Sequence, residues 1–251
     1  MDENLLKAAT ENFDLPHDII MLPSKGRFYK SKKKSVKIGY LTASDEDLIV
    51  SGSRNKSNIV LSLIRNKLYE RDIRPDEMLE CDIEAILLFL RNSSFGYEYN
   101  LLLTDPKTGK SFEHTEILDE LDFKITENEP DDNGYFTTKL PKTGATVKLK
   151  LLTYSEILEL EDMADKYPEH RVVPKVTWRL LKQIISFNDN EDRGLISDFV
   201  NDLPIMDSKH IRNFLSQNQP SIDLKRIAIA PSGEKVSFDI TFGVDFFRPF
   251  F

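Results

Sequence analysis

The chain has 251 residues, of which 40 % are hydrophobic and 30 % are charged, with 12 prolines and 10 glycines. This composition is typical of a globular chain with one or two cores, and it excludes collagen, coiled coil and bulk disorder. No apolar stretch approaches the roughly 20 residues that cross a bilayer, and the acidic N-terminus differs from a signal peptide. We therefore expect the chain to stay in the compartment where it is made and to bind no membrane.

Charge and cysteine content narrow the function further. The 34 lysines and arginines against 42 aspartates and glutamates give a net charge of −8, which disfavours binding to nucleic acid. One cysteine, Cys81, and four scattered histidines predict a reducing compartment and no metal or other cofactor. The local exception is the lysine-rich stretch from Lys30 to Lys37, which we interpret as a solvated loop.

A tight turn is predicted directly after an N-terminal tail of residues 1–21. Pro23 starts this turn, and Gly26 can adopt the positive φ that closes it. Phe28 and Tyr29 follow, and we consider both as candidate partner contacts, with Phe28 expected to face inward.

The remaining elements of the first half are predicted from hydrophobic periodicity and turn residues. An alternating pattern indicates a strand, and Ser44 is the expected N-cap of the helix that follows it. In chain order, the expected elements are a strand over 36–41, a helix from Ser44, a helix over 57–70, a buried helix over 82–91, and a hairpin of strands 97–103 and 111–114.

Beyond residue 140 the same order of elements starts again. Residues 36–45 align with residues 147–156 at a constant offset, and Asp82 aligns with Asp207 in a second block. Each copy begins with a Leu-Pro turn and ends in a Pro-Gly hairpin. The residues that form these turns are Pro23, Gly26, Pro106 and Gly109 in the first copy, and Pro141, Gly144, Pro231 and Gly233 in the second. The repeated order predicts an internal duplication.

The predicted fold class is therefore α+β, with two similar units that each contain a short strand, helices and a Pro-Gly β-hairpin. The second unit has predicted helices over 154–166, 175–185 and 207–215. The predicted division of the chain is a tail (1–21), a first unit (22–126), an acidic connector (127–139) and a second unit with a Phe-rich C-terminus (140–251).

The C-terminus carries four phenylalanines within six residues. Each side chain gains about 1.5–3 kcal/mol on full burial, so these residues either fold back onto a core or are buried by a partner. The candidate partner-binding residues here are Phe246, Phe247, Arg248, Phe250 and Phe251. We favour partner docking for the outermost pair.

Catalytic signatures are missing from the sequence. It contains no phosphate-binding glycine loop, no metalloprotease motif and no nucleophile elbow. His210 is interpreted as a surface or capping residue, Cys81 as a small core residue, and residues 189–192 as a solvated loop. The sequence therefore predicts a protein that is not an enzyme and has no small-molecule substrate.

The two Leu-Pro turns, the strands that end in Leu-Thr, the second hairpin and the terminal Phe-Phe-Arg-Pro together resemble the small baseplate-hub proteins of T-even-type contractile-tailed bacteriophages. The resemblance spans about residues 20–250, and that family includes a minor hub subunit and a hub assembly factor. Many relatives carry paired cysteines at both hairpins, whereas this chain keeps only the proline and glycine at 105–109 and 230–233. The resemblance thus implies degenerate, metal-free, zinc-ribbon-like hairpins, because the thiolates that bind zinc are missing.

The function implied by this resemblance is assembly of the baseplate hub through protein–protein binding, as a chaperone-like assembly factor or as a minor hub subunit. The implied partners are other tail and hub proteins, with the tape-measure protein as a further candidate. The implied location is the host cytoplasm during assembly, or the virion if the protein stays in the tail. The alternative is a host-directed regulatory or nucleic-acid-associated viral protein that uses the Lys30–Lys37 loop. The salt dependence of binding distinguishes hub assembly from the nucleic-acid role, because phosphate binding weakens steeply with salt and apolar docking does not.

Overall fold

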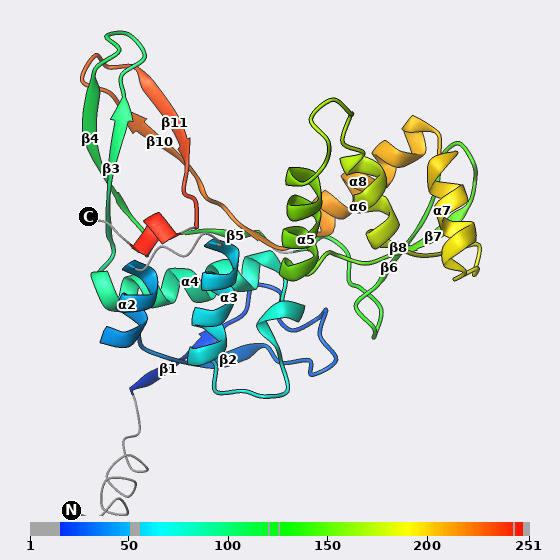
Figure 1. Cartoon of the computed structure of the whole chain (residues 1–251), viewed down its shortest axis with the longest axis horizontal. Coiled ribbons are helices and arrows are strands. Elements are labelled where there is room, and N and C mark those ends of the chain that lie inside the picture. Colours follow the sequence, from blue (N-terminus) through cyan, green and yellow to red (C-terminus); the bar gives the residue numbers. More distant parts are fainter. Residues whose placement is uncertain (1–15, 51–55, 120, 125, 243, 248–251) are drawn as a thin grey trace, which may run out of the picture.

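The computed structural model describes residues 16–50, 56–119, 121–124, 126–242 and 244–247, and it confirms a mixed α and β fold with small antiparallel sheets (Figure 1). The first half of the chain contains β1 (His17–Met21), β2 (Ser35–Gly39), α2 (Ala43–Val50), α3 (Lys56–Lys67), the 3-10 turn η1 (Pro75–Glu77), α4 (Glu80–Phe95), β3 (Glu98–Thr104) and β4 (Ser111–Ile117). The second half contains β5 (Phe123–Lys124), β6 (Phe136–Lys139), β7 (Thr146–Leu149), α5 (Tyr154–Asp165), α6 (Lys175–Gln183), β8 (Ile184–Phe187), α7 (Arg193–Asn201), α8 (Ile205–Asn218), β9 (Ser221–Ile222), β10 (Lys225–Ile229), β11 (Lys235–Asp239) and the 3-10 turn η2 (Val244–Phe247).

The first strand lies in the segment that the sequence analysis assigns to the tail. β1 pairs antiparallel with β2, from His17 opposite Gly39 to Met21 opposite Ser35. Ile20 packs against the core, and Leu22, directly after the strand, is buried. Residues 17–21 therefore form a paired strand with β2, in which Ile20 faces the core while Ile19 and Met21 remain exposed.

Threonines, rather than the expected Ser44, begin the helices α2 and α5. The Thr42 backbone N and Oγ1 donate to the Asp45 carboxylate at 2.7 and 2.6 Å, at the start of α2. Thr153 and Glu156 form a capping box at the start of α5. Prediction of Ser44 as the N-cap is wrong, because Thr42 reaches the acidic residue three positions later.

The predicted helix over 175–185 ends two residues early. α6 stops at Gln183, and Ile184 starts β8, which joins β6 and β7 in a three-stranded sheet. Residues 184–187 read Ile-Ile-Ser-Phe, which suits a strand as well as the end of an apolar helix. Pairing with β7 makes this segment a strand, and hydrophobic periodicity alone does not predict that pairing.

The long helix α4 organises the core of the first half. It is buried along most of its length, as predicted, including Ile83, Ile86 and Leu90. β1, α3, β9 and the C-terminal turn η2 all contact it. Helices α5 to α8 and the sheet β6–β7–β8 form a second group beside it (Figure 1). No helix in the described part of the chain is long and apolar enough to span a membrane.

The two predicted hairpins form and lie against each other, although they come from opposite halves of the chain (Figure 1). Arg226 on β10 forms an ion pair with Glu116 on β4 at 3.2 Å. The rings of Phe238 and His114 meet edge to face at 5.5 Å, and Ser232 Oγ donates to Asp105 Oδ1 at 2.8 Å. The second half therefore contributes its hairpin to the first half's side of the molecule.

Candidate functional site

Buried aspartates hold both Leu-Pro turns in place. Asp82, the third residue of α4, is fully buried and accepts hydrogen bonds from Ser24 N, Ser24 Oγ and Tyr29 OH. Tyr29 OH in turn accepts a bond from Leu79 N at 2.8 Å. The first turn is thus fixed to the beginning of α4 through a closed network.

The second turn is also held by an aspartate at the beginning of a helix, through two backbone amides. Asp207, the third residue of α8, is fully buried and accepts bonds from Lys142 N at 2.7 Å and Thr143 N at 2.9 Å. Burial raises the pKa of Asp82 despite its hydrogen bonds. Burial also opposes the charge on Asp207, but the amides of Thr143 and Lys142 outweigh it and lower the pKa. Both carboxylates therefore act as hydrogen-bond acceptors that stabilise the two turns.

The four glycines of the predicted turns adopt the expected conformation. Gly26, Gly109, Gly144 and Gly233 all have positive φ, between 68° and 85°. At Gly26 a Cβ atom would lie only 2.2 Å from the carbonyl oxygen of Lys33, so this position also requires the small size of glycine.

The aromatic residues after the first turn face the interior of the protein. Tyr29 is buried in the Asp82 network, and Phe28 is half-buried with its ring 5.8 Å from that of Phe136. The candidate partner contacts Phe28 and Tyr29 thus pack within the folded chain. Their burial follows from the close turn, which leads the chain back over the beginning of α4.

The basic turn lies against the acidic connector. Arg27 forms an ion pair with Glu129 at 3.0 Å, and Lys32 Nζ donates to the backbone oxygen of Asp132 at 2.6 Å. Lys33 pairs with Asp72 at 2.9 Å. A shallow cavity of about 270 Å³ separates the two segments. Within the stretch from Lys30 to Lys37, Lys33 is thus neutralised by an acidic side chain, and Lys32 is held by backbone oxygens.

The C-terminal aromatics contribute to the core. Phe246 is 1 % exposed and Phe247 is 3 % exposed. The Arg91 guanidinium carbon lies 5.2 Å from the ring centre of Tyr99 and 5.7 Å from that of Phe246. The candidates Phe246 and Phe247 are therefore core residues in the folded chain, because Phe246 covers the arginine that α4 buries and Phe247 packs edge-on against Phe246. The remaining candidates Arg248, Phe250 and Phe251 lie outside the described residues.

Exposed aliphatic side chains gather on the outer faces of the paired hairpins. Leu102 on β3 is 72 % exposed, and Ile227 and Ile229 on β10 are 61 % and 60 % exposed. The sequence analysis did not identify these residues. The signal available was the uninterrupted run Leu101-Leu102-Leu103, which places a leucine on the outer face of a strand whose other face is packed.

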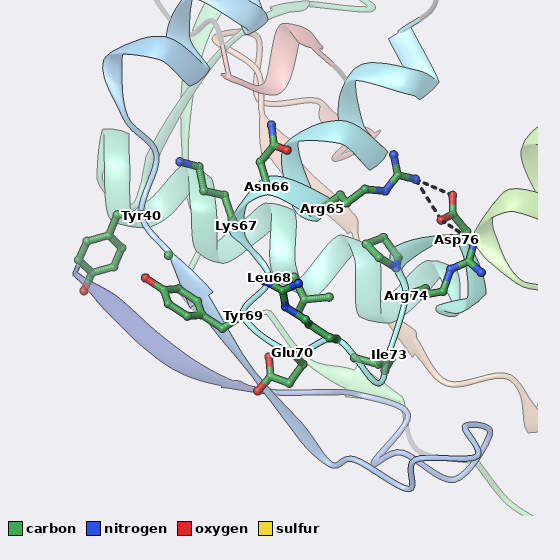
Figure 2. A pocket seen from close by; sticks show the side chains of 13 residues that line it. Tyr40, Arg65, Asn66, Lys67, Leu68, Tyr69, Glu70, Ile73, Arg74 and Asp76 are labelled. Atoms are coloured by element: carbon green, nitrogen blue, oxygen red, sulfur yellow. Dashed lines mark hydrogen bonds and ion pairs between the residues drawn. The ribbon is translucent and has the colours of Figure 1, made fainter. Parts of the chain in front are cut away.

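A cavity of about 700 Å³ lies between the end of β2, the end of α3 and the segment up to Asp76. Figure 2 shows Tyr40 and Tyr69 at one side and Arg65 with Asp76 at the other. Arg65 Nη2 contacts both Asp76 carboxylate oxygens at 3.0 Å. The Glu70 carboxylate accepts a bond from Lys37 N at 2.9 Å. These charged groups support the local fold.

The described residues contain no group of three or more histidine, cysteine or acidic side chains that could hold a metal ion. Cys81 is buried beside Asp82, and burial raises the pKa of its thiol well above the ordinary value. The thiol is therefore kept in its neutral form, as a small core residue.

The comparison with protein families matches residues 22–248 to the family described as T4 bacteriophage base plate protein. The chain matches no curated protein and no solved structure. Because the match covers most of the 251 residues, the chain belongs to this base plate family.

Proposed function

We propose that this base plate protein helps to assemble the central hub of a phage tail through protein–protein binding, as an assembly factor or as a minor hub subunit. The observation that carries the proposal is membership of the base plate family over residues 22–248. The exposed aliphatic residues on the hairpins support it, because such residues lose water favourably when a partner covers them.

The proposed partners are other tail and baseplate-hub proteins, with the tape-measure protein as a further candidate. Arg248, Phe250 and Phe251 remain proposed contacts to them. Aromatic and arginine side chains suit this role because they are common among residues that dominate binding energy. The family also makes a non-enzymatic role the natural expectation.

We also propose that the two units arose by duplication, with units 22–126 and 140–251 joined by the connector 127–139. The order of two strands, three helices and a hairpin occurs in both halves, from β1 to β4 and from β6 to β11. The turn η1 is additional in the first series and β8, α7 and β9 in the second, and the leading strands β1 and β6 lie just before the proposed unit bounds. Asp82 and Asp207 hold equivalent turns, and Thr42 and Thr153 begin equivalent helices. The hairpins keep the proline and glycine of a degenerate zinc ribbon.

The alternative role at nucleic acid has less support, because Arg27, Lys32 and Lys33 are paired within the chain. Binding of a mixed-sequence duplex across a salt series tests it. Steeply salt-dependent binding at physiological salt would favour the alternative over hub assembly.

Deletion of the gene from the phage tests the main proposal. We expect infected cells to accumulate tails without complete baseplates, as seen by electron microscopy, and a plasmid copy to restore them. Purified wild-type particles then separate the two forms of the proposal. Protein present in particles indicates a hub subunit, and protein found only in infected cells indicates an assembly factor. Normal baseplates in the deletion phage would overturn both.

A further inference from the structure

The outer faces of the two hairpins differ in charge. In the antiparallel pairing, Leu102 on β3 lies opposite Glu113 on β4, and Glu98 lies on the same outer face. The outward residues of this face are Glu98, Asn100, Leu102, Thr104, Ser111, Glu113, Thr115 and Ile117. They form an aliphatic and acidic surface with no positive charge.

The outer face of the second hairpin has the opposite character. Ile229 on β10 lies opposite Lys235 on β11, and Ile227 lies opposite Ser237. Lys225 and Asp239 complete the face at the base of the hairpin. This face carries two isoleucines, two lysines and one aspartate, all exposed.

The packing inside the chain shows what covers a hairpin face of this kind. The inner face of β3–β4 is covered by the inner face of β10–β11, with acidic Glu116 paired to basic Arg226. The two outer faces point in opposite directions from this packed pair and have the same division of charge, acid on β3–β4 and base on β10–β11. A second copy of the chain therefore offers a surface of opposite charge that also carries exposed aliphatic side chains.

We propose that the outer face of β3–β4 in one copy docks on the outer face of β10–β11 in a second copy. Leu102 packs against Ile227 and Ile229, and Glu113 lies near Lys235. Because the two faces are different patches, the contact is heterologous, and each copy retains one free face for a further copy. The hairpins are short, so the area is below the roughly 800 Å² per partner of a standard interface, and association depends on concentration.

Blocking one face at a time tests this arrangement. L102D blocks the acidic face, and the double variant I227D/I229D blocks the basic face. V172D places the same new charge at a valine that is 93 % exposed and lies outside both hairpins, and it serves as the matched control. Molar mass is measured by sedimentation equilibrium across a hundredfold range of concentration, with unfolding curves to show that each variant remains folded.

We expect the wild-type protein and V172D to increase in mass with concentration beyond two chains, and each blocked variant alone to stay monomeric. An equimolar mixture of L102D and I227D/I229D should form a species of two chains and no larger one, because only one intact pair of faces remains. A wild-type protein that is monomeric throughout the range overturns the proposal and leaves these faces to another occupant. Association of a blocked variant with itself, or no dimer in the mixture, also overturns it.

Discussion

Replacement of Phe246 by alanine removes the residue that joins the C-terminal turn to the first core. Its ring is 1 % exposed and lies 5.4 Å from that of Tyr99 and 4.8 Å from that of Phe242, with Arg91 at 5.7 Å. Loss of a buried phenylalanine costs about 3–5 kcal/mol of unfolding free energy, since the cavity cannot close completely. In a chain of this size each kcal/mol lowers Tm by roughly 2–4 °C, so we expect F246A to melt about 6–20 °C below wild type.

Circular dichroism melts at constant pH and concentration measure this shift. The matched control is F123A, since Phe123 is a strand residue that is 49 % exposed, and we expect it to lose less than about 1 kcal/mol. F246L keeps much of the buried volume and should melt between wild type and F246A. A Tm of F246A within about 1 °C of wild type would refute the assignment of the C-terminal aromatics to the core.

Three further predictions concern single sites. Burial and Glu80 raise the pKa of Glu84 to about 8, so the folded chain keeps a proton that the unfolded chain loses above about pH 4.5. The contribution of Glu84 to the free energy of unfolding therefore falls as pH rises from about 4.5 to about 8. In urea unfolding, Glu84→Gln should raise the free energy of unfolding by roughly 2–4 kcal/mol at pH 8 and change it little at pH 4.5. Equal increases at both pH values would contradict this. Asp207→Ala should cost roughly 2–4 kcal/mol near neutral pH, because it leaves two part-buried amides without their acceptor. The folded carboxylate has a lowered pKa, so this stabilisation should be lost as pH falls below about 4, where the unfolded chain takes up the proton first, and a constant difference between variant and wild type contradicts it. F250S/F251S should melt close to wild type while capture of hub proteins drops, and a large fall in Tm with intact capture per folded molecule argues against docking.

Much of the local structure can be predicted from the sequence. The Leu-Pro turns, both hairpins and the helices other than α7 follow from proline, glycine and apolar periodicity, which act over a few residues. The helix α7 (Arg193–Asn201) was not predicted. The end of α6 at Gln183 does not follow, because the strand β8 depends on a partner strand about forty residues earlier. Short apolar runs remain ambiguous until such a partner is known.

The candidate site could be predicted only in part. The alignment of Asp82 with Asp207 was visible in the sequence, but their shared role as acceptors for the Leu-Pro turns depends on tertiary contacts. Burial of Phe246 beside Arg91 and the packing of one hairpin on the other likewise join residues more than a hundred positions apart. Composition alone does not distinguish an aromatic that completes a core from one that meets a partner.

The measurement that tests the proposed function most directly is capture of the tagged full-length protein from phage-infected cells, followed by mass spectrometry, with nuclease treatment and washes from low to high salt. We predict that baseplate-hub proteins are enriched over other phage proteins and remain bound at high salt, since apolar contacts do not depend on counterions. Capture that contains no baseplate proteins, or that disappears with nuclease or salt, would contradict a role in hub assembly through protein–protein binding.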